Sequence, residues 1–551
     1  PRVLGSEWLG ALMPLYPATA GLSSPVISRD IARARGALAE PISDPLPEAL
    51  CRTLGLMALP RALETLHRPA SHADALAARR RVAFDELFVL SLAMRLLGAT
   101  RHRPASALGN ASMQPFWSVL PFGPTDAQRA AVCDIVRDLT SGRTMNRMIQ
   151  GDVGSGKTLV AAAAAYFVAQ SGLQTALMAP TELLAEQHAR TLETLLSPLG
   201  LSVCLITGSM DVKSRRTAAA RLAAGEAFLA VGTHALLSGD TQFAHLGLVI
   251  TDEQHRFGVA QRAALSAKGN APHTLVMSAT PIPRTLSLIL YGDLDVSVIG
   301  ELPPGRSPIA TYRIGSDKRM RALGFVRDRL DEGQQAYVIC PLVENDEQSP
   351  PGLLSAAEEW ERLRREGFSS YHLGLLHGRM KPHEKEATMR AFVQGEVQLL
   401  VATTVVEVGV DVPNATVILI ENAERFGLSQ LHQLRGRVGR GTRPSTCILV
   451  SDATGSGTQQ RLRALCRTSD GFRIAEEDLH LRGPGDFLGV RQHGLPGLLN
   501  ADLAADAPLL EMAQREAQVL LESDPTLAAP RHAALSTAAR TLIAQVGESP
   551  N

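Results

Sequence analysis

The sequence contains little cysteine and few aromatic residues. Its 551 residues include 6 cysteines, none of them in a Cys-x-x-Cys pair, and only 4% are aromatic. This cysteine pattern argues against a zinc site or a disulfide framework and is typical of a protein in a reducing cytoplasm. We therefore expect the cysteines to serve as small apolar core residues.

The sequence also lacks long apolar runs and a net charge. No run reaches the ~18 apolar residues that a membrane helix needs, so we expect no membrane partner. The 55 basic and 55 acidic residues cancel, so any nucleic-acid surface must be local. With 45% hydrophobic and 20% charged residues, the composition is that of a globular protein. The length predicts about three or four domains.

A glycine loop between a short apolar stretch and a helix-forming run is the strongest motif. It consists of Gly151, Asp152, Val153, Gly154, Ser155, Gly156, Lys157 and Thr158. Glycines let the backbone N–H groups turn toward phosphate oxygens, and the following helix N-terminus favours anions. The sequence therefore predicts an ATP site, in which Lys157 reaches the β- and γ-phosphates and the Thr158 hydroxyl binds Mg²⁺.

Strands and helices alternate over most of the chain after about residue 119. Strands are predicted at 175–179, 203–207, 228–232, 246–251 and 274–278, and again at 336–340, 373–376, 399–402, 417–420 and 446–450. This alternation predicts the α/β class, with two tandem parallel-sheet domains whose helices cover both faces. Only the first block has a phosphate loop, so we expect the nucleotide to lie in a cleft between the two domains.

The two ends of the chain have helical periodicity instead. The predicted divisions are a helical segment over 1–118, sheet domains over 119–303 and 304–455, and a helical region over 456–551. Near the start, apolar spacing predicts helices at 31–38, 47–66 and 76–97. The basic run Arg79-Arg80-Arg81 is expected to be a solvated helix face, with phosphate contact as the alternative.

Acidic, hydroxyl and amide side chains complete the predicted nucleotide site. Asp252 and Glu253 end an apolar strand about one hundred residues after the loop, where ligands bind in parallel sheets. Asp252 would hold Mg²⁺ and Glu253 would orient or deprotonate the attacking water. The hydroxyls of Ser278 and Thr280 are placed to relay the nucleotide state. Gln128, upstream of the loop, is expected to read the adenine edge with its amide.

An arginine-rich motif follows in the second block. Between Arg425 and Arg443 there are five arginines and no acid, with glycines interleaved. A solvated basic face would normally carry lysines and acids as well, so this pattern indicates close approach to phosphates. Arg437 and Arg440 are predicted to be arginine fingers that contact the γ-phosphate. Such a residue can raise the rate of hydrolysis by about 10³–10⁵. Because they act only when the cleft closes, hydrolysis would be tied to domain motion.

These motifs resemble those of the superfamily 2 helicases and, within them, the RecG family of ATP-dependent DNA helicases. The resemblance covers essentially the whole chain and rests on the phosphate loop, the arginine motif and the stretches 179–188, 252–259, 279–285, 376–380, 401–413, 421–441 and 470–494. It implies two RecA-like domains and translocation on duplex DNA at stalled forks and Holliday junctions. It also implies a role in recombination and repair, a cytoplasmic, nucleoid-associated and monomeric protein, and a possible single-strand-binding protein partner.

The resemblance implies further residues that couple hydrolysis to DNA. The residues expected to couple hydrolysis to DNA or to contact DNA are His255, Ser278, Thr280, Thr404, Gln433, Arg491 and Gln492. The last two form the core of the family's translocation motif. Val490 and His493 stand where the family usually has hydroxyl residues, so two hydroxyls that could form local hydrogen bonds are lost, while the Arg-Gln pair remains. Residues expected to grip the DNA backbone without reading sequence, or simply to cap turns, are Thr181, Arg190, Thr233, His234, Thr403 and Thr404.

Two features leave alternatives open. The family carries an OB-fold wedge domain before the helical segment, and it is not found in this sequence, which begins with Pro1. We therefore expect a motor without its strand separator. A transcription-repair coupling translocase shares the tail but would need a polymerase-binding domain. A catalytically inactive DNA-binding protein is the third alternative, and the complete set of ATP-site residues argues against it.

Overall fold

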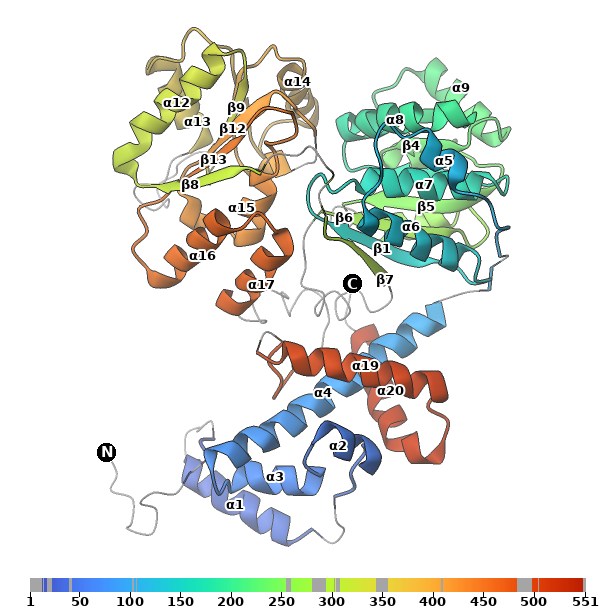
Figure 1. The fold of residues 1–551 in the computed structure, drawn as a ribbon, viewed down its shortest axis with the longest axis vertical. Coiled ribbons are helices and arrows are strands. Elements are labelled where there is room, and N and C mark those ends of the chain that lie inside the picture. Colours follow the sequence, from blue (N-terminus) through green and yellow to red (C-terminus); the bar gives the residue numbers. More distant parts are fainter. Residues whose placement is uncertain are drawn as a thin grey trace. The chain divides into compact units, whose positions relative to one another are not determined.

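The computed structural model describes residues 12, 14–16, 22–38, 42–101, 104–105, 107–253, 259–279, 294–301, 303, 308–342, 355–407, 410–482, 498–503 and 505–548. The chain divides into two compact units, one built mainly from its two ends and one from its middle (Figure 1). No described helix is both long and apolar enough to span a bilayer.

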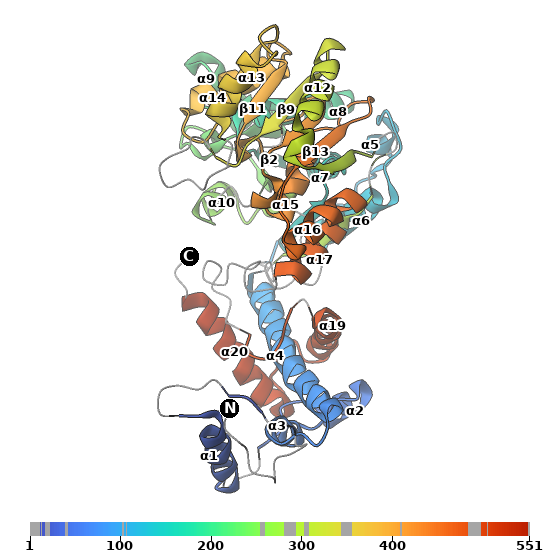
Figure 2. The ribbon, with the colours of Figure 1, turned by 90° about the vertical axis from the view of Figure 1, so that its left-hand side faces the viewer.

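The terminal unit consists of helices packed around one long helix. Its elements are α1 (Ser24–Gly36), α2 (Glu48–Leu54), α3 (Leu59–His67), α4 (His72–Arg101), α19 (Ala507–Ser523) and α20 (Ala533–Glu548). α3, α19 and α20 all pack on α4, and Figure 2 shows α19 and α20 on its two sides. The expected single helix over 47–66 is wrong, because Gly55 adopts a left-handed conformation (φ +61°) that ends α2.

The expectation of a solvated basic face holds for Arg80, which is exposed, but is wrong for Arg81, which is completely buried. Its guanidinium donates to Asp44 at 2.6 Å and to Asp85 at 3.0 Å. Arg79 pairs with Asp506, the residue immediately before α19, at 2.8 Å. Apolar periodicity does not reveal these acids: Asp44 lies in a preceding loop, Asp506 near the far end of the chain, and Asp85 one turn further along the same helix. Two of the three arginines therefore stabilise the helical unit.

The first half of the middle unit, which we call lobe 1, contains a parallel sheet. Its strands are β1 (Asn146–Gly151), β2 (Gln174–Met178), β3 (Val203–Ile206), β4 (Leu229–Gly232), β5 (Leu246–Asp252), β6 (His273–Ser278) and β7 (Asp295–Ile299), in the order β3-β4-β2-β5-β6-β1-β7. Its helices are α5 (Gln114–Ser118), α6 (Asp126–Leu139), α7 (Lys157–Ala169), α8 (Glu182–Leu196), α9 (Val212–Ala223) and α10 (Val259–Ser266).

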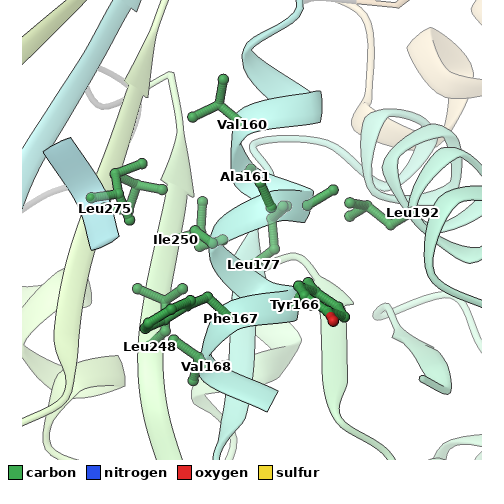
Figure 3. Close-up of a cluster of buried hydrophobic side chains, with 14 of the residues drawn as sticks. Val160, Ala161, Tyr166, Phe167, Val168, Leu177, Leu192, Leu248, Ile250 and Leu275 are labelled. Carbon is green, nitrogen blue, oxygen red and sulfur yellow. The ribbon is translucent and has the colours of Figure 1, made fainter. Parts of the chain in front are cut away.

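Helices cover both faces of this sheet, as the alternation of side chains requires. Leu177, Leu248 and Ile250 point to the face covered by α6, α7 and α8, whereas Met178 and Val249 point to the face covered by α9 and α10. Residues 159–169 of α7 are all buried, and Figure 3 shows its side chains packed among Leu248, Ile250 and Leu275 of the sheet. The alanines of α7 let its backbone approach the sheet closely, which fixes the loop at its N-terminus.

The second half, lobe 2, repeats this arrangement. Its strands are β8 (Ala310–Ile314), β9 (Gln335–Ile339), β10 (Leu373–Leu376), β11 (Leu399–Ala402), β12 (Ala415–Ile420) and β13 (Thr446–Val450), in the order β10-β11-β9-β12-β13-β8. Its helices are α12 (Arg319–Asp331), α13 (Ala356–Arg365), α14 (Pro382–Val393), α15 (Leu428–Arg435), α16 (Ser456–Arg467) and α17 (Gly471–Arg482). One face carries α12 and α13, and the other α14, α15 and α16.

The predicted fold class is confirmed: two parallel-sheet lobes accompany helical segments from both ends of the chain. The edge strands β7 and β8 were not predicted, because both are short and only partly buried. Of the six cysteines, four are buried as expected, whereas Cys133 is exposed and Cys466 is half-buried. The boundaries at 118, 303 and 455 stay predictions.

Candidate nucleotide site

The phosphate loop lies between β1 and α7 in a conformation that depends on its glycines. Gly154 and Gly156 have φ angles of +77° and +86°, in the left-handed region that side chains disfavour. A Cβ atom at Gly156 would lie 2.2 Å from Nε2 of Gln128. Both the backbone angle and the lack of space therefore require glycine at this position.

Lys157 is the first residue of α7 and lies across the loop. Its Nζ donates hydrogen bonds to the carbonyl oxygens of Gly151 at 2.8 Å and Asp152 at 2.9 Å. Desolvation lowers the pKa of Lys157, while the carboxylates of Asp252 and Glu253 act in the opposite direction. The amine is thus held at the centre of the loop among acids, which suits a group that exchanges carbonyl contacts for phosphate contacts.

Two hydroxyls of the loop accompany this amine. Thr158 is half-buried in the first turn of α7. Ser155 is buried, and among the described residues its Oγ has no hydrogen-bond partner. A buried hydroxyl costs free energy unless a ligand or water satisfies it. The loop therefore fits a phosphate-bearing ligand.

Gln128 supports the loop from α6. Its Oε1 accepts from the backbone N–H of Thr125 at 3.0 Å, and its Nε2 donates to the carbonyl oxygen of Ser155 at 2.8 Å. The side chain is 1% exposed. Both ends of the amide are thus engaged with the protein, so adenine reading by Gln128 stays a prediction and would require these contacts to open.

The two acids lie at the end of β5, as the sequence predicted. Asp252 accepts a hydrogen bond from Nε2 of His188 at 2.8 Å. Burial opposes its ionisation, but the hydrogen bond and charge of His188 and the charge of Lys157 keep the pKa of Asp252 below its usual value. Asp252 is therefore a carboxylate at neutral pH, which is the form that binds a cation.

Glu253 adopts an unusual backbone conformation. Its φ is +55°, in the left-handed region that a residue with a side chain seldom occupies. Its backbone N–H donates to the carbonyl oxygen of Met277 in β6 at 3.0 Å. This turn directs the chain away from the sheet immediately after the strand, and such strained residues are frequent at active sites.

Lobe 2 contributes the two predicted arginines to the same region. Arg437 is 3% exposed; burial and the charge of Arg440 lower its pKa to about 10, while Glu253 and Asp411 act in the opposite direction. Nη1 of Arg440 donates to Oδ1 of Asp411 at 2.6 Å, and its charge also acts on Lys157. The arginines therefore share one electrostatic environment with the loop and the acids of lobe 1.

The lobes also make a direct contact that the sequence does not predict. Nε2 of His432, in α15, lies 2.6 Å from Oδ1 of Asp152 in the phosphate loop. Nη2 of Arg435 lies 2.8 Å from Nδ1 of the same ring, and because arginine can only donate, Nδ1 accepts and Nε2 carries the proton given to Asp152. Gly436 follows, and a Cβ there would lie 3.0 Å from Cβ of Val153. The glycines of the arginine motif thus allow close approach to the loop.

The remaining predicted residues are distributed as follows. Ser278 is buried at the end of β6, Thr404 is half-buried after β11, and Gln433 is half-buried in α15. Their roles in coupling stay predictions. His255, Thr280, Arg491 and Gln492 lie outside the described residues. The missed residues His188, Asp411 and His432 all lie within the motif stretches, but nothing in the sequence indicates which partners they contact.

A cavity between the lobes contains several of the residues predicted to contact DNA. Its volume is about 320 Å³, and its lining includes Thr181, Thr233 and His234 of lobe 1 and Lys385 and Val405 of lobe 2. Thr181 also caps α8, since its Oγ1 accepts from the N–H of Leu184 at 3.4 Å. Within the described part of the chain, the buried Oγ1 of Thr233 has no hydrogen-bond partner. The cavity therefore offers hydroxyl and amine donors beside an apolar floor.

Two parallel-sheet lobes that bring together a phosphate loop, two strand-end acids and two arginines from the opposite lobe define a motor domain of the superfamily 2 helicase class. Family models agree: the DEAD/DEAH box helicase model matches residues 125–289, and the helicase conserved C-terminal domain matches residues 319–442. A third model, described as ATP-dependent DNA helicase RecG, domain 3, C-terminal, matches residues 468–544.

The curated relatives narrow the class, and the chain belongs to the RecG family. It is 44% identical to the ATP-dependent DNA helicase RecG of Bacillus subtilis over 95% of this chain and 77% of that protein. The Synechocystis RecG is 46% identical over 95% of this chain and 63% of its own length, and that of Escherichia coli K12 is 45% identical over 93% and 75%. A solved structure of RecG bound to a three-way DNA junction covers 92% of this chain and 67% of that one, with a TM-score of 0.71 and 40% identity. The chain thus spans roughly two thirds to three quarters of its relatives.

Proposed function

We propose that this chain is the motor of a DNA-dependent ATPase that translocates on duplex DNA at branched structures, regressing stalled forks and moving Holliday junctions in recombination and repair. The observation that carries this proposal is the convergence of loop, acids and arginines from two lobes. Family membership supports branched duplex DNA as the partner, because a family member was solved on a three-way junction.

Each predicted residue has a place in the proposed hydrolysis. Lys157 and the loop amides would bind the β- and γ-phosphates of ATP, and Thr158 and Asp252 would hold Mg²⁺, which neutralises phosphate charge. Glu253 would orient the attacking water. Arg437 and Arg440 would stabilise the charge that develops on the transferred phosphoryl group. Since the arginines come from lobe 2, hydrolysis requires closure of the lobes.

The cavity with Thr181, Thr233 and Lys385 would take the DNA backbone. Hydroxyl and ammonium groups bind phosphates without reading bases, so translocation would be independent of sequence. In branch migration each base pair opened, at about 1.4 kcal/mol, is replaced by one formed. ATP would therefore supply direction to an exchange that is almost neutral in energy.

Finer features of the proposal come from the family alone. We expect a monomer in the bacterial cytoplasm, associated with the nucleoid, with single-strand-binding protein as a possible partner. The RNA-polymerase-dependent translocase and the inactive scaffold are not favoured, because the narrower family model matches and the ATP-site residues lie together.

Steady-state ATP hydrolysis with different DNA substrates tests the proposal. Forked and four-way DNA should stimulate phosphate release by more than about tenfold over no DNA, and more than a blunt duplex of the same length. A fluorescent four-way junction should be converted to duplex products only with ATP and Mg²⁺. Hydrolysis that ignores DNA, or that requires RNA polymerase, would contradict the proposal.

A further inference from the structure

Three consecutive residues of α8 contact three different parts of the nucleotide site and of lobe 2. These are Glu186, Gln187 and His188, which lie in the second turn of the helix. Successive helix residues point about 100° apart, so the three side chains reach separate partners. The hydrolysis proposed above assigns no role to Glu186 or Gln187.

Glu186 forms an ion pair across the lobes. Its carboxylate accepts two hydrogen bonds from Arg390 of α14, with Nη2 to Oε1 at 2.9 Å and Nη1 to Oε2 at 3.2 Å. The Arg390 side chain is 41% exposed and that of Glu186 18%. Two-point geometry makes the pair specific, and partial exposure keeps it weak enough to open. Such a pair suits a contact that forms and breaks in each cycle.

Gln187 contacts the segment that holds an arginine finger. Its Oε1 accepts a hydrogen bond from the backbone N–H of Asp411 in lobe 2 at 3.1 Å. The carboxylate of Asp411 in turn accepts from Nη1 of Arg440 at 2.6 Å. The position of the Arg440 guanidinium therefore depends on a backbone group that α8 fixes.

His188 and the start of α8 join this contact to the other sites. His188 donates to Asp252 at 2.8 Å, so α8 also orients the acid proposed to hold Mg²⁺. At the N-terminal end of the helix, Thr181, Glu182 and Leu183 line the cavity proposed for DNA. These contacts lie within about 12 Å along one rigid helix, at 1.5 Å per residue. The helix therefore connects the cavity, Asp252 and lobe 2.

We propose that Glu186 and Gln187 are positioning residues that latch lobe 2 onto α8, so that Arg440 is placed for hydrolysis only while α8 contacts both DNA and Asp252. This inference rests on the proposed function, since it specifies how that hydrolysis responds to DNA. The latch acts on kcat through Arg440 and leaves nucleotide binding to the phosphate loop of lobe 1 unchanged.

A charge swap tests the ion pair. Glu186→Arg and Arg390→Glu should each lower the DNA-stimulated kcat by about tenfold or more, because each places like charges across the lobes. The double variant E186R/R390E restores the pair in reverse, with Glu386 and Arg190 beside it, and should therefore recover part of the lost kcat and exceed both single variants. The affinity for a fluorescent ADP analogue and the thermal midpoint should be unchanged in all three.

A matched control uses an ion pair that lies within lobe 2. Arg329 and Glu332 are 2.8 Å apart and partly exposed, and their single reversals should leave kcat at the wild-type value. Gln187→Ala should lower kcat about fivefold to tenfold, and Gln187→Glu, which keeps an acceptor oxygen for the Asp411 N–H, should recover part of it.

The outcomes separate the two proposals. If the wild-type chain shows no DNA-stimulated hydrolysis, the proposed function is wrong and the latch with it. If the wild type hydrolyses ATP and the single reversals are as active, the latch alone is wrong. A double variant no better than the worse single variant would also contradict it, because a paired contact must be restored by the swap.

Discussion

The two lobes share one topology, but the loop after the first strand of each lobe has different partners in the two. Matching the strand orders aligns β1 with β8 and β5 with β12. Lys157 therefore corresponds to Arg319, since each is the first residue of the helix after the matched strand. Asp252, the last residue of β5, corresponds to Glu421, which directly follows β12. Both lobes thus place a cation opposite a strand-end acid.

In lobe 2 these groups bind each other rather than a ligand. Nε of Arg319 donates to Glu421 at 2.6 Å, and its Nη2 donates to Glu359 of α13. The loop N–H of Ser316 donates to the carboxylate of Asp452 at 2.8 Å. Carboxylates of the protein therefore occupy the positions beside this amide and this cation that phosphates would occupy in lobe 1. The comparison shows how one fold becomes a nucleotide site or a closed structural unit.

Removing the cation of lobe 1 should have the largest effect on activity. Lys157→Ala should lower DNA-stimulated hydrolysis by about 10²–10³-fold or more, because the charge that contacts the phosphates is lost. The free energy of unfolding should change by no more than about 1–2 kcal/mol, since this amine is already desolvated among backbone carbonyls. Phosphate release and circular dichroism measure the two quantities.

Lys213→Ala, an exposed position on α9, serves as the control and should match the wild type in both measurements. An active Lys157→Ala variant would show that the phosphate-loop assignment is wrong.

Removing the cation of lobe 2 should act on stability instead. Arg319→Leu leaves Glu359 and Glu421, which are 0% and 1% exposed, without their shared partner. Breaking a buried ion pair on one side costs about 3–5 kcal/mol. Urea unfolding monitored at Trp360 of α13, with Trp8 and Trp117 replaced by phenylalanine, reports on lobe 2.

The triple variant R319L/E359Q/E421Q replaces the two carboxyl groups that lose Arg319 with neutral amides and should recover most of the loss. If Arg319→Leu unfolds at the wild-type urea concentration, the cluster does not stabilise lobe 2 and the comparison of the lobes fails.

These predictions also show which parts of the site the sequence could reveal. Strands β2 to β6 and β9 to β13 were predicted to within about two residues, because continuous apolar runs between helical segments allow few alternatives. The loop and Asp252 were found because their chemistry depends on residues adjacent in sequence. The contacts of Arg81 with Asp44, of Arg319 with Glu359 and Glu421, and of Asp152 with His432 were not found, because these partners lie dozens to hundreds of residues apart in the sequence. Pairings of that kind are set by packing rather than by local pattern.

The smallest expected effect is a difference in pH dependence between the lobes. Burial raises the pKa of Glu359 to about 7, with Arg319 acting in the opposite direction and Glu421 adding to the rise. The folded lobe 2 therefore keeps a proton on this carboxyl up to about pH 7, whereas the unfolded chain releases it near its ordinary value of 4.5. Stability from this group is present at low pH and is lost as the pH rises from 4.5 to 7. The acid of lobe 1, Asp252, has a lowered pKa and behaves in the opposite way.

Glu359→Gln keeps the shape and an acceptor for Arg319 but cannot titrate. The wild type should lose at least about 1 kcal/mol of lobe 2 stability relative to E359Q between pH 5 and pH 8. Urea unfolding at Trp360 at both pH values measures this difference. Comparing the two proteins cancels the contribution of other titrating groups, such as Asp85 in the helical unit, where burial raises the pKa to about 6. Equal pH dependence in both proteins would mean that Arg319 keeps Glu359 ionised. In that case the cluster would hold two full carboxylates on one arginine, and the Arg319→Leu loss should exceed that of an ordinary buried pair.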